Sequence, residues 1–534
     1  MSQDLRPTLT AYVRQRVQAF DEGFRHHLAV FGPVGSGKSF LLQQGVSSCA
    51  QGRALPVVVT LQRDSMRAFL RRFSTAVLES AITPDRDEPL EALLARAAIT
   101  LPNTTAAIAQ LGRYQTGRLQ AEAFTHALDV IPVLHQELQR PCIIVLDEFL
   151  HLEGLGVSHA FHELGKRVMT WPFALFLLSS SSTFRARDIV REQLQLLFGQ
   201  FEVIALGPTE PSAAIPWMAR ELPESESMSR VLQFVHRWLG GSPWSMSVLL
   251  RRMKERLLLK RDRTLDAETL LVRAAWDVLG HPNGALYQWC AAQADQALHV
   301  RDGLLARETL GALARGMRTT QAIAGYCGTR RNVSLALQAL VERDLIQRKG
   351  ACWVIPDQLL ACWLAAQPEA GQPRGAKTRQ AAAKRFKQAI HTLWAQWQQA
   401  TTQPFAERIG RLLSCFRNET VSLDHKTGRL PSFQTLRTEQ PTPGGQTYVV
   451  ADGTGRRWCC LVREGTLEEG EIAAFEEFCR TQSPRPSRKV VIAQDGLELN
   501  ATLAAKAANM WVWDPDDVAL LSVLYGQPMA SRSC

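Results

Sequence analysis

The sequence predicts an α/β fold built on a five-stranded, largely parallel sheet covered by helices. Two observations predict this class. Short apolar runs alternate with helical patterns, which is typical of parallel sheets that are buried on both faces. In addition, a glycine-rich turn joins the first apolar run to a helix. The five expected strands lie within residues 27–31, 55–61, 141–150, 173–180 and 201–206.

The glycine-rich turn after the first expected strand is a phosphate-binding motif. Its residues match the pattern GxxxxGK[ST] at every fixed position. Glycines let backbone N–H groups approach phosphates closely, and the following helix N-terminus adds a favourable dipole. Lys38 is expected to neutralise the β and γ phosphates, and Ser39 to be a Mg²⁺ ligand. The predicted nucleotide-binding residues are Gly32, Pro33, Val34, Gly35, Ser36, Gly37, Lys38 and Ser39.

The third expected strand lies in PCIIVLDEFL at 141–150 and is followed by two acids. Phosphate loops need such a partner, because a carboxylate must reach the same metal ion. Asp147 is expected to hold Mg²⁺ through water, and Glu148 to act as general base toward the attacking water. The alternative is a helix cap or surface pair after a buried strand. The two motifs together favour a nucleotide-hydrolysing site.

These motifs resemble those of AAA+/STAND-type ATPases of the archaeal-ATPase group, which are related to the origin recognition complex ATPases. The resemblance extends over roughly residues 20–365 and includes GPVGSGKS, IIVLDEF, FLLSSSS, LFGQFEVIALGP, WLGGSPWSMSVLL and WVIPDQLLACWL. It implies ATP and Mg²⁺ as cofactors and a helical lid after the sheet. It also implies that Pro243 contacts the nucleotide. Alternatively, Pro243 begins an ordinary helix capped by Ser242.

The same resemblance implies a polar γ-phosphate sensor at the end of the fourth strand. Residues 179–183 offer five hydroxyls, and Ser180 is the candidate among them; a serine-rich turn is the alternative. The lid sensor arginine that such ATPases usually carry has no clear counterpart. Arg251 and Arg252 follow Pro243 by a helix length, and the candidates for an arginine finger are Arg185, Arg187 and Arg191.

Residues 303–356 predict three helices and a hairpin, the pattern of a winged helix. Thr319 is the expected N-cap of the second helix. The third helix is expected to bury Val333, Leu335, Leu337, Leu340 and Leu345. Its N-terminal end and the hairpin carry side chains suited to base edges and phosphates. The predicted DNA-contacting residues are Arg330, Arg331, Asn332, Ser334, Arg348 and Lys349. The alternative is an internal packing module that senses the nucleotide state.

The C-terminal part from about residue 388 predicts a separate α/β domain that resembles restriction endonucleases in element order. Active members have an acid on one strand of a hairpin and Glu-x-Lys on the next, which bind Mg²⁺. Here the second strand contains Leu461, Val462 and Arg463 instead. Asp452 is expected in a turn with Gly453, and Glu464 is displaced. The sequence therefore predicts a domain that does not cleave DNA.

Composition fits a cytoplasmic protein that binds polyanions. The formal charge is +10, with 61 basic and 51 acidic residues. Basic runs occupy 251–263 and 374–387, although either could be a solvated face. The eleven cysteines are scattered without metal-binding spacing, and neither a signal peptide nor a membrane span is evident.

We expect an ATPase core at 1–208, a helical lid at 209–300, a winged helix at 301–365, a basic linker at 366–387 and the endonuclease-like domain at 388–534. The first hypothesis is an ATP-dependent, DNA-associated regulator or loader acting on double-stranded DNA. The second is a STAND-type switch that acts on a protein effector, and homo-oligomers fit both. An ATP-gated nuclease is the weakest hypothesis, because the carboxylates that would bind the metal ion are not at the required positions.

Overall fold

The structure is a computed structural model. It describes residues 4–47, 53–82, 88–114, 119–194, 201–259, 266–328, 332–367, 376–423, 426–440 and 446–527. The chain divides into two compact units. Unit 1 comprises Met1–Trp217 and Gly241–Ser245, and unit 2 comprises Met218–Gly240 and Met246–Cys534.

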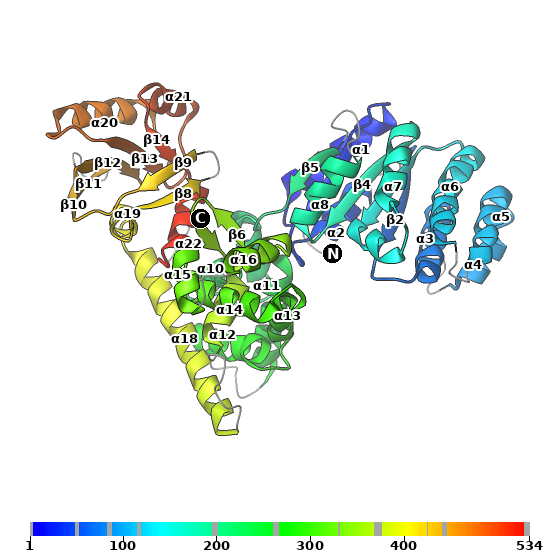
Figure 1. The fold of residues 1–534 in the computed structure, drawn as a ribbon, viewed down its shortest axis with the longest axis horizontal. Helices are drawn as coiled ribbons and strands as arrows, with labels where there is room; N and C mark the ends of the chain where they lie inside the picture. The colour runs from blue at the N-terminus through cyan, green and yellow to red at the C-terminus, as the bar shows by residue number, and fades with distance from the viewer. Residues whose placement is uncertain are drawn as a thin grey trace. The chain divides into compact units, whose positions relative to one another are not determined.

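Unit 1 contains the predicted five-stranded parallel sheet (Figure 1). Its order is β2-β3-β4-β1-β5, and each pair of neighbours is parallel. The expected strands are confirmed to within a few residues at each end. Their bounds are β1 His27–Phe31, β2 Leu55–Thr60, β3 Cys142–Asp147, β4 Ala174–Ser180 and β5 Phe201–Ala205.

Helices cover both faces of this sheet. Alternate residues of β1 enter separate cores: Leu28 and Val30 pack with α1 and α2, whereas Ala29 and Phe31 pack with α3, α6 and α7. This period of two is what a strand buried on both faces requires. The helices are α1 Pro7–Asp21, α2 Lys38–Val46, α3 Met66–Ala81, α4 Leu90–Ala97, α5 Pro102–Leu111, α6 Gln120–Leu138, α7 Ala160–Thr170, α8 Thr183–Ile189 and α9 Pro211–Ala219. Short 3-10 or π segments of unit 1 are Gly112–Tyr114, Phe149–Leu155 and Val190–Leu194, and those of unit 2 are Trp276–Gly280 and Gln296–His299.

Unit 2 begins with helices and continues into a helix–helix–helix–hairpin segment in the order the sequence predicts. Thr319 caps the second of these three helices by accepting from the N–H of Ala322. Leu335 was expected in the core and this is wrong, because it is 63% exposed. Ala336 takes that place, since the buried face repeats at 333, 336, 337 and 340. The elements are α10 Glu226–Trp238, α11 Pro243–Leu258, α12 Ala267–Ala275, α13 Ala285–Asp295, α14 Gly303–Ala314, α15 Thr320–Tyr326, α16 Val333–Glu342, β6 Gln347–Lys349, β7 Cys352–Val354 and α17 Gln358–Ala366.

The expected basic linker at 366–387 is partly helix. The helix α18 runs over Ala376–Thr402 and is continuous with the expected start of the last domain (Figure 1). Aromatic contacts explain this: Phe386, within the expected linker, meets Trp276 edge to face. Further along the helix, Trp394 and Trp397 stack on each other and meet Phe234 of α10 edge to face. Tertiary packing thus extends a helix into a stretch that composition alone marks as a linker.

The C-terminal part of unit 2 is a mixed sheet of order β10-β11-β12-β13-β14. The first three strands are antiparallel and the last three are parallel. One face packs against α20 and α21, and the other against α19 and α22. The elements are α19 Phe405–Ser414, β8 Glu419–Leu423, β9 Lys426–Leu430, β10 Thr435–Glu439, β11 Thr447–Gly453, β12 Arg456–Arg463, α20 Glu469–Thr481, β13 Arg488–Ala493, α21 Leu499–Ala507, β14 Trp511–Trp513 and α22 Pro515–Leu524.

The β6–β7 hairpin is packed against this C-terminal part. The N–H of Ala351 donates to the carbonyl of Thr420 in β8 at 2.9 Å. Gly350, with φ +69°, lies so close to β8 that a Cβ atom would be 2.7 Å from that same carbonyl oxygen. Cys352 and Val354 of β7 belong to the C-terminal core. The tip of the hairpin is therefore held by β8.

Candidate functional site

The sheet order brings three loops to one edge of unit 1. In a parallel sheet the carboxyl ends of neighbouring strands meet at the same edge. Phe31 lies opposite Ser180, so the loops after β1 and β4 are adjacent, and β3 lies on the other side of β4. The glycine-rich loop, the acids after β3 and the serines after β4 therefore converge.

The glycine-rich loop has the conformation that its glycines permit. Gly35 and Gly37 have φ values of +79° and +93°, which side chains with a Cβ rarely adopt. Gly37 precedes the first residue of α2, whose N-terminal N–H groups point into the loop. The hydroxyl of Ser36 is buried without a partner among the described residues. Together these features form a concave, electropositive backbone suited to phosphate.

Ser39 and Asp147 form the expected metal-binding pair. The Ser39 hydroxyl donates to Asp147 Oδ2 at 2.6 Å, and Asp147 is only 6% exposed. Ser179 donates to the other carboxylate oxygen and also accepts from the N–H of Glu148 at 3.0 Å. Ser179 thus fixes the rotamer of Asp147 and the backbone of its neighbour. An oriented carboxylate beside a hydroxyl is the oxygen donor set that Mg²⁺ prefers.

Lys38 and Glu148 face each other across the loop. Their Nζ and Oε1 atoms are 3.4 Å apart, and Lys38 is 5% exposed. Burial lowers the pKa of Lys38, and the carboxylate of Glu148 offsets part of this effect. Nζ also donates to the carbonyls of Gly32 and Pro33 at 2.9 and 3.1 Å. A desolvated ammonium held at the loop can attract the charge of a phosphate strongly.

The hydroxyl beside Lys38 and Glu148 belongs to Ser181, whereas Ser180 was expected there. Ser181 accepts from Lys38 Nζ at 2.8 Å and donates to Glu148 Oε1, and its N–H donates to Oε2 at 2.8 Å. The hydroxyl of Ser180 instead donates to the carbonyl of Ser182. The reason is strand alternation: β4 ends at Ser180, whose side chain is fully buried.

Glu148 has an unusual backbone. Its φ of +58° lies in the left-handed region, which non-glycine residues avoid. Strain of this kind persists where surrounding contacts impose it, and it is concentrated at functional sites. Here the imposing contacts are those with Ser179 and Ser181. They hold the carboxylate toward Lys38.

The start of α11 lies against the glycine-rich loop within unit 1. The N–H of Trp244 donates to the carbonyl of Gly35 at 3.3 Å, and a Cβ on Gly35 would be 2.7 Å from Trp244 Cβ. The carbonyl of Gly241 accepts from the N–H and hydroxyl of Thr209. Pro243, the expected contact, is the first residue of α11 and is next to Trp244. The sequence interpretation missed Trp244.

Arg6 is a second residue that the sequence interpretation missed. Its guanidinium donates to the carbonyls of Ser36 and Gly207 at 3.4 and 2.5 Å. It therefore links the glycine-rich loop to the segment after β5. Burial lowers its pKa, which Glu210 partly offsets. No sequence pattern marks an arginine 26 residues before the loop.

The arginines considered for sensor and finger roles have structural partners or lie on the surface. Arg252 pairs with Asp277 at 2.7 Å, and Arg185 pairs with Glu153 at 3.0 Å. Arg191 pairs with Asp188 and Glu192. Arg251 and Arg187 are exposed. None of the five contacts the glycine-rich loop through a bond found among the described residues.

The predicted DNA contacts are only partly described. Arg330 and Arg331 lie outside the described residues. Asn332 precedes α16 with φ +70°, and Ser334 is exposed in its first turn. Arg348 is exposed, with its guanidinium carbon 5.5 Å from the centre of the Trp353 ring, while Lys349 is half-buried. The hairpin that carries these two cations is the one that packs on β8.

The acids of the C-terminal sheet are engaged by other groups. Asp452 was expected in a turn, but it lies within β11, and the turn to β12 falls at Thr454 and Gly455. Its carboxylate pairs with Arg457 at 2.5 Å and Arg437 at 3.0 Å. Glu464 accepts from the N–H of Phe405 at 2.6 Å. In the described part of the chain, no cluster of three or more His, Cys, Asp or Glu could hold a metal.

The residues at the unit 1 site fit a nucleotide with Mg²⁺. The loop has a helix N-terminus, glycines in the left-handed region and a buried hydroxyl that has no partner in the part of the chain that the structure describes. The hydroxyl–carboxylate pair offers oxygen ligands, and Lys38 offers a buried positive charge. This donor set matches phosphate and a hard cation.

No model of a known protein family matches the chain, and no curated protein matches it. Solved structures with some similarity include a Walker-type ATPase of Pyrococcus abyssi, at 14% identity and a TM-score of 0.44, which covers 67% of this chain and 95% of that one. The Aeropyrum pernix ORC1 protein in complex with DNA is 13% identical, with a TM-score of 0.33 and coverage of 68% and 92%. AMPPCP-bound DnaA from Aquifex aeolicus is 12% identical, with a TM-score of 0.29 and coverage of 64% and 89%. Values this low assign neither a family nor an activity.

Among the described helices, none combines the length and the apolarity needed to cross a bilayer. The described cysteines are free thiols.

Proposed function

We propose that this chain binds and hydrolyses ATP with Mg²⁺, and that the nucleotide state regulates an interaction with DNA. The observation that carries the proposal is the convergence of Ser39, Asp147, Lys38 and Glu148 at one edge of a parallel sheet. Each of these side chains has the chemistry that one part of a phosphoryl-transfer site requires.

The roles follow from these positions. Lys38 and the loop N–H groups would bind the β and γ phosphates. Ser39 and Asp147 would hold Mg²⁺, which supplies charge neutralisation on the phosphates when bound. Glu148 would take a proton from the attacking water, and Ser181 would orient Glu148 and Lys38. We assign this positioning role to Ser181 in place of Ser180, because its hydroxyl bonds both side chains.

The start of α11 supports a link between the site and unit 2. Trp244 contacts the loop at Gly35, and the same helix continues into unit 2. A change at the loop on nucleotide binding would therefore act on Trp244 and Pro243 and through them on α11. This supports the proposal that the nucleotide state regulates the helical lid, the winged helix and the C-terminal domain.

DNA is the favoured target because Asn332 and Ser334, which are exposed at the start of α16, are polar, and the flanking sequence is basic. Binding of duplex DNA should weaken steeply with added salt in the presence of ATP and Mg²⁺. A plot of log affinity against log salt has a negative slope, and the double change Arg330→Ala and Arg331→Ala should make that slope shallower by roughly 2. The matched control is Arg343→Ala at the other end of α16. No measurable binding with ATP and Mg²⁺ would reject the DNA target.

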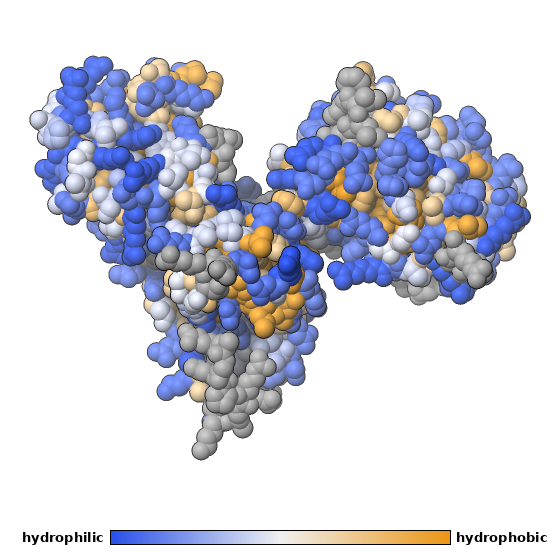
Figure 2. Space-filling model, viewed as in Figure 1, coloured by the Kyte–Doolittle hydropathy of each residue, from blue (hydrophilic) through white to orange (hydrophobic). Residues whose placement is uncertain are grey.

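A protein effector is the second candidate, and exposed apolar side chains favour it. Leu304 of α14 and Leu335 of α16 are 75% and 63% exposed, and the two helices pack together. Figure 2 shows apolar surface gathered over this part of unit 2. If these apolar side chains mediate an assembly that the nucleotide controls, the mass of the particles that the chain forms in solution should differ between ATP and ADP. Leu335→Asp should remove that difference. A constant mass in both nucleotides would count against this candidate.

A further inference from the structure

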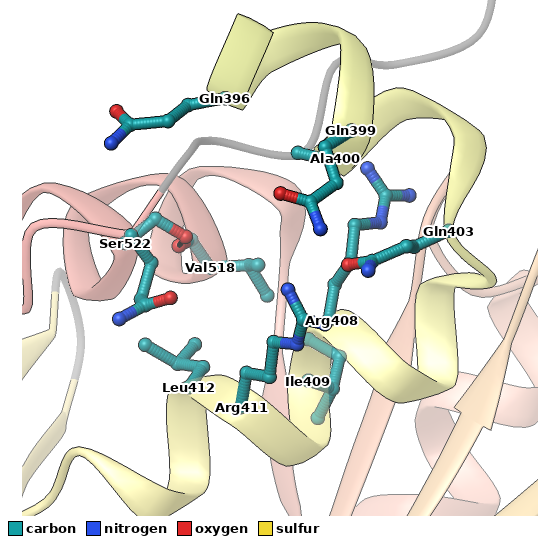
Figure 3. Close-up of a pocket in the computed structure, with 11 residues that line it drawn as sticks. Gln396, Gln399, Ala400, Gln403, Arg408, Ile409, Arg411, Leu412, Val518 and Ser522 are labelled. Carbon is teal, nitrogen blue, oxygen red and sulfur yellow. Dashed lines mark hydrogen bonds between the residues drawn. The ribbon is translucent and has the colours of Figure 1, made fainter. Parts of the chain in front are cut away.

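A cavity in the C-terminal part of unit 2 is lined by polar side chains that the proposed function does not use. It lies between the end of α18, the helix α19 and α22, it is open to solvent, and its volume for a water-sized probe is about 50 Å³. Figure 3 shows Gln399, Gln403, Arg408 and Arg411 extending toward the space between the end of α18 and α19, whereas Gln396 points away from the arginines. Its apolar wall includes Ile409, Leu412 and Val518. A site of this size holds a group about as large as a phosphate, and the rest of a larger ligand would lie at its mouth.

The charged residues that line the cavity are both arginines. Arg408 and Arg411 lie on α19 three residues apart, so they share one side of the helix. None of the described lining residues is acidic. The side chains that line the cavity therefore carry net positive charge, and a ligand that they hold should carry negative charge.

Arg408 is partly desolvated without a matching anion. Its Nε atom is buried with no partner in the described part of the chain, and its guanidinium carbon is 5.3 Å from the centre of the Phe405 ring. Burial lowers its pKa, and the acid that offsets this is Glu464. However, Glu464 accepts from the N–H of Phe405 and forms no ion pair within 4 Å of Arg408 among the described residues. A buried guanidinium is stabilised when an anion satisfies it.

The remaining polar lining is amide. Gln396, Gln399 and Gln403 recur at intervals of three and four, so they line one side of α18 and the turn that follows it. An amide offers a donor and an acceptor without charge, so it leaves the positive potential of the arginines intact. Glutamine can also pair with the edge of a nucleobase through both atoms.

We propose that this cavity binds a nucleotide, with Arg408 and Arg411 on its phosphate and the glutamine amides on its base or sugar. Arginine forks match phosphate oxygens with two parallel hydrogen bonds. The nucleotide is either free or part of a nucleic-acid strand, since both present the same groups. The site is separate from the glycine-rich loop of unit 1 and does not depend on its activity.

The test uses the full chain with Lys38→Ala, which removes the phosphate contact of the unit 1 loop. Two probes are titrated: AMP, by calorimetry, and a 5′-phosphorylated oligothymidylate labelled for fluorescence anisotropy. We expect saturable binding of at least one probe. Arg408→Gln and Arg411→Gln should each weaken it about 10-fold or more. Arg417→Gln removes the same charge from an exposed residue outside the cavity and should change binding less than about 2-fold.

The two probes distinguish the sources of the nucleotide. Binding of AMP with the expected losses identifies a free nucleotide, whereas binding of the oligonucleotide alone identifies a strand. Arg411 is exposed, so Arg411→Gln tests the site even if Arg408→Gln unfolds. Equal losses in the Arg417→Gln control would overturn the proposal. Failure of both probes to bind, with a lower Tm in the arginine variants, would also overturn it and assign these arginines to the C-terminal end of α18.

Discussion

The two five-stranded sheets of this chain place acids near strand ends, but they give those acids opposite partners. In unit 1, Asp147 and Glu148 meet hydroxyls and a buried lysine. In the C-terminal sheet, Asp452 is paired with two arginines. A carboxylate that two guanidiniums satisfy has little capacity left for a metal, whereas one oriented by serines keeps it. The chemistry of an acid therefore depends on its partners more than on its place in a sheet.

The largest expected effect comes from removing Lys38, the buried lysine of the unit 1 site. Lys38→Ala should reduce ATP affinity by at least about 100-fold, because a desolvated charge–phosphate contact is removed. Binding of a fluorescent ATP analogue measures it. Lys166→Ala, at an exposed lysine paired with Glu163, is the control and should bind normally. Unchanged affinity in Lys38→Ala would place nucleotide binding elsewhere.

The next effect separates binding from turnover. Glu148→Gln keeps the shape of the side chain but cannot accept a proton, so ATP should still bind while kcat falls by about 10² to 10⁴. Steady-state phosphate release measures kcat, and the analogue titration measures binding. Normal hydrolysis by this variant would show that Glu148 is not the general base, even if Lys38→Ala behaves as expected.

Much of unit 1 was predictable from sequence, because its signals are local. Apolar runs bounded by turns located five strands, and the fixed spacing of GPVGSGKS located the loop. The choice among five consecutive hydroxyls was not predictable. It depends on where β4 ends and on which side each serine then faces, which placed Ser181 and not Ser180 beside Glu148.

Unit 2 was harder to predict, because distant contacts determine its features. The helical first half of α18, where Phe386 meets Trp276, and the docking of the hairpin on β8 rest on residues far apart in the sequence. Leu335 was assigned to the core since it is apolar, but the faces of α16 are set by its period and neighbours. Trp244 and Arg6 reach the loop through tertiary structure alone.

A third prediction concerns the hairpin that packs on β8. Gly350→Ala should destabilise unit 2 by about 1–3 kcal/mol more than Gly328→Ala. Both glycines have similar φ values, +69° and +65°, so the backbone strain is matched. A Cβ on Gly350 would meet Thr420 and Ser422, whereas a Cβ on Gly328 would have no atom of the described, non-adjacent residues within 4 Å. Urea unfolding measures the difference. Equal effects would show that the hairpin is not held by β8.

A fourth prediction is a pH dependence specific to the first sheet. His27 lies in β1 and accepts from the N–H of Phe176, and burial, followed by the charge of Arg25, lowers its pKa to about 3. Because the unfolded chain binds this proton near pH 6.5 and the folded chain does not, stability falls as pH drops from about 6.5 toward 3.

The expected loss is about 1.4 kcal/mol per pH unit, or about 2 kcal/mol at pH 5. His27→Asn keeps an acceptor near the same position but does not titrate in this range. Its drop in Tm between pH 7 and pH 5 should therefore be smaller than that of the unaltered chain. An identical drop would assign the acid sensitivity to other groups.

The smallest effect is expected at the arginine-paired acid of the second sheet. Its pairing with Arg457, and then with Arg437, lowers the pKa of Asp452, so the carboxylate stays ionised at neutral pH. The pair is partly exposed, and Asp452→Asn should change the free energy of unfolding by about 1 kcal/mol or less at pH 7.

The same variant tests whether these acids take part in DNA cleavage. The purified chain, Asp452→Asn and Glu464→Gln are each incubated with ATP, Mg²⁺ and plasmid DNA. Neither change should alter the DNA products, since neither acid is free to hold a metal. Loss of a Mg²⁺-dependent cleavage in either variant would mean that these acids leave their arginine and backbone partners to bind the ion, and the contrast between the two sheets would fail.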